Sequence, residues 1–266
     1  VDWQGRKNLY FGQYFRWAPC LNCREWEEYL KRMCTIALAE GGFDGIMFDN
    51  VFDYPCYCGR CQTAFRAHLA KISPEERERR FGFADVDGVL LPRMERGKMR
   101  HLETKDPVFQ AWALWRCETM NGVMRRFRDH IKSVKPDAIV SGNPSPYRSR
   151  ALFLDRAQDM SELCKAFDFI IMQNDNFPEV KDERIFNRVR DLKFAQDCGQ
   201  RIVALCDTDT KIIPEREAKF LMPIVEDVVF GGIPTDRTVL APSPEPGFLN
   251  REVYERRRRH HAAFNA

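Results

Sequence analysis

Short apolar runs alternate with longer segments of helical periodicity along most of this 266-residue chain. Six apolar runs, each followed by polar residues, are predicted to be strands: residues 8–15, 43–50, 137–144, 167–175, 201–209 and 227–234. Between them, apolar side chains recur at helical spacing over residues 24–40, 60–71, 107–136, 155–166, 181–198 and 215–226. This alternation of strand and helix indicates a parallel sheet with crossover helices.

The expected fold is α/β, of the (β/α)8 TIM-barrel type, in one domain that spans residues 1–266, because a barrel of this length commonly folds as one unit. Residues 51–105 are expected to hold a Cys-rich loop and an insertion, and the charged stretch from 73 to 105 is expected to be irregular. A closed barrel needs eight strand–helix units. Since six are counted, the first two are expected upstream of Val1. Unpaired strand edges favour association, so a homo-oligomer is one expected outcome.

The charge balance bears on the kind of partner. Basic residues number 42 and acidic residues 39, for a net charge of +3, and this balance argues against a nucleic-acid surface. The basic stretch at 255–261 is interpreted as the solvated end of a C-terminal helix, where cations suit the helix dipole. No long apolar run and no signal peptide are visible, so the sequence predicts no membrane partner and a cytoplasmic location.

Five of the ten cysteines are grouped in two short segments: Cys20, Cys23, Cys56, Cys58 and Cys61. Clustered thiols in a chain without a visible secretory signal indicate a metal rather than disulfides. Zinc takes four tetrahedral ligands, and a C-x-C-x2-C turn can supply three of them. The fourth is expected from Cys20, with Cys23 as the alternative. Four thiolates leave no open position, so the zinc is expected to be structural. Ordinary buried or disulfide-paired cysteines are the competing interpretation.

The stretch "FDNV…CYCGRCQTAFRAHL" resembles the zinc-containing β-galactosidases of glycoside hydrolase family 42 and the related hypothetical glycosyl hydrolase barrels (family 6-like). In those proteins a strand that ends in Asp-Asn-Glu or a similar triplet is followed by C-x-C-x2-C and a helix with an Ala-Phe-Arg-like start. The match here covers Asp49-Asn50, the three cysteines and Ala64-Phe65-Arg66. The resemblance implies a barrel that hydrolyses glycosides.

One position departs from that family. Val51 stands where the resemblance would place the glutamate that serves as general acid/base. A valine cannot transfer a proton, so a hydrolase built on this chain needs another carboxyl group as its acid.

Glycoside hydrolysis usually requires two carboxyl groups that face each other across the sugar. Asp49 and Asp175, each just past an apolar strand, are the expected catalytic pair, with Asp207 in reserve and Asp209 and Glu179 as further candidates. Planar amides suit a polyhydroxylated ligand, and aromatic rings suit sugar faces. The expected substrate-binding residues are Asn50, Gln173, Asn174, Asn143, Trp17 and Tyr14. Loop-bracing roles for the polar residues and core packing for the rings are the alternatives.

The sequence therefore predicts a glycoside hydrolase that acts on a carbohydrate through paired aspartates and carries a structural zinc. The alternative is a non-catalytic carbohydrate-binding barrel, for which Val51 is the best argument. A zinc-stabilised nucleic-acid binder would rest on the basic C-terminal stretch and the thiols, and the balanced charge argues against it.

Overall fold

The computed structural model describes residues 1–10, 13–94, 105–144, 150–174, 179–181, 183–186, 189–206, 224–236, 259 and 262. The chain forms two compact units. The first unit comprises Val1–Ile46, Val51–Val140 and Ser149–Ala166, and the second comprises Met47–Asn50, Ser141–Arg148 and Phe167–Ala266. Among the described residues, no helix is both long and apolar enough to cross a membrane.

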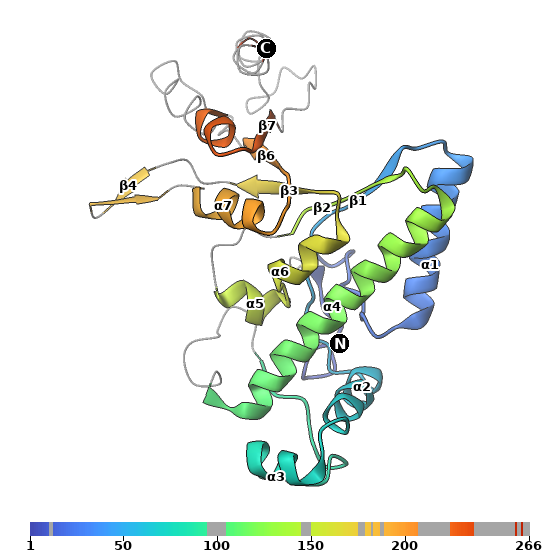
Figure 1. Ribbon diagram of the computed structural model, residues 1–266. Coiled ribbons are helices and arrows are strands. Elements are labelled where there is room, and N and C mark those ends of the chain that lie inside the picture. The colour runs from blue at the N-terminus through green and yellow to red at the C-terminus, as the bar shows by residue number, and fades with distance from the viewer. Residues whose placement is uncertain are drawn as a thin grey trace. The chain divides into compact units, whose positions relative to one another are not determined.

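Five strands form one sheet in the order β1-β2-β3-β6-β7 (Figure 1). Their bounds are Gly45–Phe48, Ile139–Gly142, Phe169–Asn174, Ile202–Cys206 and Ile233–Asp236. The pairs β2–β3, β3–β6 and β6–β7 are parallel. Spatial order follows chain order throughout, as in a barrel, whereas the order reverses at the switch point of a doubly wound sheet. The predicted parallel α/β architecture is confirmed.

The second unit packs its sheet against α7 (Val189–Asp197). Its buried core is made of five apolar side chains from α7 and the neighbouring strands: Met172, Leu192, Ala195, Ile202 and Ala204. The prediction of one helix over 181–198 is wrong in its first part. Two short strands, β4 (Glu179–Lys181) and β5 (Arg184–Phe186), form an antiparallel hairpin in which Val180 pairs with Ile185.

The last predicted strand is displaced along the chain. Residues 224–229 are helical, and β7 begins only at Ile233. Gly231 has a φ of 79°, a left-handed conformation that ends the helix and that glycine adopts at little cost. The strand predicted at 227–234 is therefore wrong over residues 227–232. Most of the helix predicted at 215–226 lies outside the described residues.

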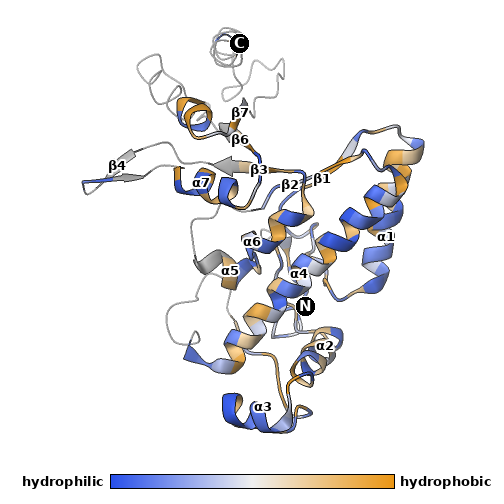
Figure 2. Ribbon diagram, in the orientation of Figure 1, coloured by the Kyte–Doolittle hydropathy of each residue, from blue (hydrophilic) through white to orange (hydrophobic). Residues whose placement is uncertain are grey.

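The first unit is organised on the long helix α4 (Pro107–Val134). The Asp106 side chain accepts a hydrogen bond from the Val108 N–H, and Pro107 occupies the first turn, where its missing donor costs nothing. Figure 2 shows apolar and polar residues alternating along α4, as expected of a helix with one buried face. The helix contacts α1 (Arg24–Thr35), α2 (Gly59–Leu69) and α3 (Pro74–Phe81) (Figure 1).

Three predictions for the first unit are wrong. The described part of residues 8–15 forms no sheet strand, because the chain turns back on itself and Leu9 pairs with Trp17 in an isolated antiparallel bridge. The stretch from 73 contains α3, with Ser73 as its N-cap. The helix predicted at 155–166 is replaced by α5 (Arg150–Arg156) and α6 (Met160–Leu163) with a 3₁₀ turn, because Ala157 has a φ of 54° and breaks the helical path.

A partly buried ion pair joins α1 to α4. Glu27 accepts hydrogen bonds from Arg126 through both carboxylate oxygens, at 2.8 and 2.7 Å, and Lys31 lies 3.0 Å from one of them. The hydrogen bonds from Arg126 are the main reason that the pKa of Glu27 is lowered to about 2. A carboxyl whose pKa is lower in the folded chain stabilises the fold above its ordinary pKa and loses that contribution as the pH falls.

We expect Glu27→Gln to reduce the free energy of unfolding at pH 6 by on the order of 2 kcal/mol, because Arg126 is half exposed and solvent screens part of the pairing. The difference from wild type should shrink between pH 4.5 and pH 2, where Glu27 becomes protonated in both states. Denaturant titrations at several pH values measure this. Glu28→Gln, which removes an exposed carboxylate one position away, is the matched control. A pH-independent difference would contradict the assignment.

Candidate metal centre and strand-end site

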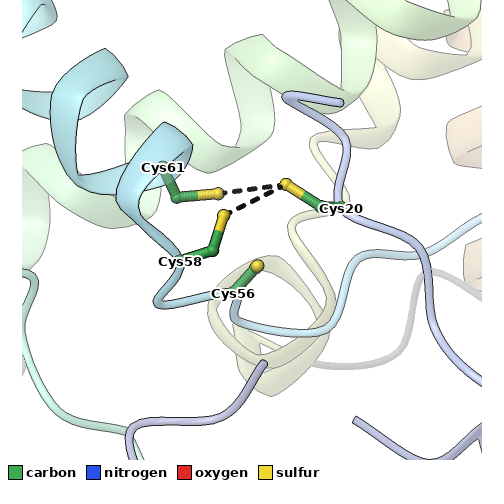
Figure 3. Close-up of side chains that lie close together, drawn as sticks. All are labelled: Cys20, Cys56, Cys58 and Cys61. Carbon is green, nitrogen blue, oxygen red and sulfur yellow. Dashed lines mark hydrogen bonds between the residues drawn. The ribbon is translucent and has the colours of Figure 1, made fainter. Parts of the chain in front are cut away.

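Four cysteines of the first unit converge on one point (Figure 3). Cys56 lies in the loop before α2, Cys58 is the N-cap of α2, Cys61 lies in its first turn, and Cys20 lies in the loop before α1. The Cys20 sulfur is 3.4 Å from that of Cys61 and 3.6 Å from that of Cys58, and all four sulfurs lie within 4.8 Å of one another. A tetrahedral zinc–thiolate site places its sulfurs about 3.8 Å apart. The cluster therefore fits a metal with four thiolate ligands.

Cys23 is excluded from this cluster. Its sulfur donates to the Glu25 carboxylate at 3.3 Å and accepts from Arg60 at 3.7 Å. Arg60 and Glu25 also pair with each other at 3.1 Å, which holds Cys23 in a separate polar contact. Between Cys20 and Cys23, the alternatives that the sequence left open, this geometry favours Cys20. Nine cysteines form no disulfide: Cys20, Cys23, Cys34, Cys56, Cys58, Cys61, Cys117, Cys164 and Cys198.

The thiols of the cluster influence one another's ionisation. Hydrogen bonds from Cys20 and Cys61 lower the pKa of Cys56, whereas hydrogen bonds to Cys20 and Cys56 raise the pKa of Cys61. The hydrogen bond with Cys56 likewise raises the pKa of Cys20 to about 12. One thiolate is therefore favoured at the expense of its neighbours. A bound cation supplies the charge that lets all four sulfurs ionise together, and it releases their protons.

Apolar packing surrounds the cluster. Cys56 and Cys61 are themselves part of the buried core of the first unit. The other buried members of that core come from α2, α4 and the segment between them: Phe65, Leu69, Leu91, Met94, Phe109, Ala111, Trp112 and Trp115. In addition, the Asn22 amide donates to the Cys61 sulfur at 3.3 Å. A closed set of four sulfur ligands, two of them buried, is typical of a structural site.

A buried arginine braces the segment that leads to the cysteines. Arg116 of α4 is 3% exposed and donates to the Asp53 carboxylate at 3.0 Å. It also donates to the backbone carbonyls of Leu154 and Asp155, at 2.7 and 3.3 Å. Burial raises the pKa of Asp53 to about 6, although the positive charge of Arg116 acts to lower it. Sequence reasoning missed this pair, because its members lie 63 positions apart and neither belongs to a motif.

In the second unit, Asp49 follows the C-terminal end of β1 and is held by two amides. The Asn50 side chain donates to one carboxylate oxygen at 2.6 Å, and the Asn143 side chain donates to the other at 3.1 Å. Asn143 is 7% exposed and is fixed by its backbone hydrogen bond to Phe48. Asn50 has a φ of 55°, a left-handed conformation that asparagine tolerates better than most residues. The predicted residues Asn50 and Asn143 thus orient the Asp49 carboxylate.

The structure describes only some of the other predicted catalytic and substrate-binding residues. Gln173 and Asn174 end β3, where they pair with Leu205 and Cys206 of β6. Asp175, Asp207 and Asp209 lie outside the described residues, and Glu179 begins the hairpin strand β4. Tyr14 and Trp17 lie in the first unit and are 82% and 59% exposed. The catalytic role of Asp49 and the identity of its partner therefore both stay predictions.

No family model matches this chain, and no curated protein matches it. Several solved structures are similar to this chain. A β-galactosidase from Bacillus circulans sp. alkalophilus superimposes with a TM-score of 0.69 at 18% identity, over 99% of this chain and 42% of that chain. A catalytic mutant of Gan42B, a GH42 β-galactosidase from G. stearothermophilus, gives 0.64 at 11% identity, over 92% and 40%. The catalytic domain of a β-amylase from Paenibacillus polymyxa gives 0.61 at 12% identity, over 88% and 67%.

The chain therefore has the fold of the TIM-barrel glycoside hydrolases, as the sequence resemblance predicted. It spans about two fifths of the length of the two β-galactosidases. At sequence identities of 18%, 12% and 11%, the structural similarity establishes the fold alone.

Proposed function

We propose that this chain belongs to a glycoside hydrolase in which Asp49 acts on a carbohydrate substrate. The observation that carries the proposal is the placement of Asp49 at the carboxyl end of a parallel strand, with an amide donor on each carboxylate oxygen. Ligands of barrel enzymes bind at that edge of the strands. The fold of the glycoside hydrolases supports carbohydrate as the substrate class.

The proposed chemistry assigns a separate role to each carboxyl group. Asp49, which accepts hydrogen bonds on both oxygens, is the nucleophile or base. Asp175 is the acid that protonates the glycosidic oxygen as the bond to the sugar breaks, and Asp207 is its reserve. Gln173 and Asn174 bond sugar hydroxyls, and Tyr14 and Trp17 offer exposed rings for sugar faces.

The metal of this proposal is zinc, held by Cys20, Cys56, Cys58 and Cys61. All four ligand positions are filled by protein sulfur, so the ion supplies folding free energy and no open position for a substrate. Metal analysis of the purified chain should give close to one zinc per molecule. Thiols that alkylate readily without a chelator, in metal-free protein, would contradict this assignment.

The second candidate function is a carbohydrate-binding barrel without catalysis. Val51 favours it, because this residue replaces the glutamate expected from the resemblance and its side chain is 5% exposed. Val51 has no proton to transfer, and its burial also keeps it away from a substrate. Any general acid must therefore be another residue.

A panel of aryl glycosides and oligosaccharides separates the two candidates. The hydrolase predicts release of the aryl group from at least one glycoside, and it predicts that Asp49→Asn abolishes that release. The binding barrel predicts affinity for oligosaccharides with no turnover across the panel. Absence of both binding and turnover would contradict both candidates.

A further inference from the structure

A loop of the first unit presents aromatic rings to solvent. We call residues 7–10 and 13–18 the aromatic loop, because they include four aromatic side chains. Tyr14, Phe15 and Trp17 are 82%, 66% and 59% exposed, and the rings of Tyr14 and Phe15 meet edge to face at 5.3 Å. Large apolar side chains that gather on a surface commonly mark a binding site.

The charges of the aromatic loop all have one sign. Lys7 and Arg16 are its ionisable cations, and the segment contains no aspartate or glutamate. The Lys7 ammonium lies 4.0 Å from the centre of the Trp17 ring, and the Arg16 guanidinium lies 4.5 Å from that of Tyr10. These cation–π contacts hold both positive charges against aromatic faces. The exposed rings therefore lie beside fixed positive charge.

A row of stacked groups extends from the aromatic loop to the segment after β1. Tyr10 stacks on Phe52 with ring centres 5.6 Å apart and an interplanar angle of 7°. The Arg156 guanidinium lies 4.9 Å from the Phe52 ring. The row thus runs Arg16–Tyr10–Phe52–Arg156, and a guanidinium stands at each end.

We propose that the aromatic loop binds an acidic polysaccharide, a chain of sugars that carry carboxylate or sulfate groups. The inference rests on the proposed function and specifies its substrate class. Sugar faces stack on Trp17 and Tyr14, while the acidic groups pair with Arg16 and Lys7. A nucleic acid would use the same groups, but the near-neutral charge of the whole chain gives no extended basic surface for its phosphates.

The test measures the affinity of the full chain for polygalacturonate and for neutral galactan, and for dextran sulfate and neutral dextran, by isothermal titration calorimetry. The two acidic polymers distinguish carboxylate from sulfate. An acidic polymer that binds should do so at least about tenfold more tightly than its neutral counterpart. Its affinity should fall as salt is added.

Two variants probe the loop itself, and each has a matched control. Arg16→Gln should reduce the preference for the acidic polymer, because only the Lys7 charge then remains in the loop, and Trp17→Ala should weaken binding of both polymers by about tenfold. Arg80→Gln removes a guanidinium that lies 4.9 Å from the Phe81 ring in α3, outside the aromatic loop. Tyr29→Ala removes a ring that is 59% exposed in α1. Both controls should bind as wild type does, and circular dichroism checks that all four variants fold.

Equal affinity for acidic and neutral polymers would overturn the inference, and so would wild-type binding by Arg16→Gln. Comparable binding of single-stranded DNA or of vesicles of anionic lipid would also overturn it, because the loop would then be a general anion surface. Turnover of neutral glycosides without any preference for acidic polymers would contradict the inference and leave the proposed function standing. Loop-dependent binding of an acidic polymer without turnover would support the inference and contradict hydrolysis.

Discussion

Cys61→Ser is expected to abolish metal binding and to destabilise the first unit by several kcal/mol. The reason is that Cys61 contributes one of four converging sulfurs, and three ligands retain a structural metal far less tightly. Structural zinc contributes about 10–16 kcal/mol in zinc-finger peptides, where it provides most of the folding free energy. The first unit also has an apolar core of its own, so we expect a smaller loss here.

Metal content by mass spectrometry and thermal unfolding with and without a chelator measure this effect. Wild type should hold one metal ion per chain, and chelation should lower its melting temperature, whereas Cys61→Ser should hold none and respond little to the chelator. Cys23→Ser is the matched control, because Cys23 lies nearby in sequence but bonds Glu25 and Arg60 instead.

A hydroxyl in place of a buried thiol is itself destabilising, and Cys34→Ser controls for that cost. Cys34 is 6% exposed in α1 and is not one of the four converging cysteines. It should destabilise the chain and leave the metal content unchanged. If Cys61→Ser kept the wild-type metal content, the four-sulfur site would be refuted, whatever its effect on stability.

The elements predicted well were those with a strong periodic signal. The run of apolar positions in α4, opened by Asp106 and Pro107, is long enough that packing and propensity agree. α3 was missed because its residues are almost all charged, although Ser73, Pro74 and the following glutamates form an N-terminal signal. The hairpin β4–β5 was missed because a few apolar residues among many charges fit either period.

The candidate site was predictable where chemistry fixes the spacing. Three thiols within six residues are typical of a metal-binding turn, so the cluster was predictable, but only the positions of Cys23 and Glu25 in space could exclude Cys23. The brace between Asp53 and Arg116 depends on contacts across distant segments, which one sequence does not reveal. The role of Asn143 as a partner of Asp49 likewise follows from the pairing of neighbouring strands.

Asp49→Asn is expected to lower turnover of a responsive glycoside by about 10³-fold or more, because an amide can neither attack the sugar nor accept a proton. The substitution preserves the shape of the side chain, and its one remaining oxygen can still accept a hydrogen bond from Asn50 or Asn143, so the fold should survive. Initial rates at saturating substrate, with thermal unfolding measured in parallel, test both halves of the expectation.

Asn143→Ala distinguishes orientation from chemistry at the same site. It removes the 3.1 Å hydrogen bond to Asp49 but leaves the carboxylate, so we expect a smaller loss of about 10- to 100-fold. Asp44→Asn provides the control, since Asp44 precedes the other end of β1, where it is exposed and pairs with Lys135. It should keep the wild-type rate. Near-wild-type turnover by Asp49→Asn would refute the assignment and make Asp207 or Glu179 the next carboxylate to test.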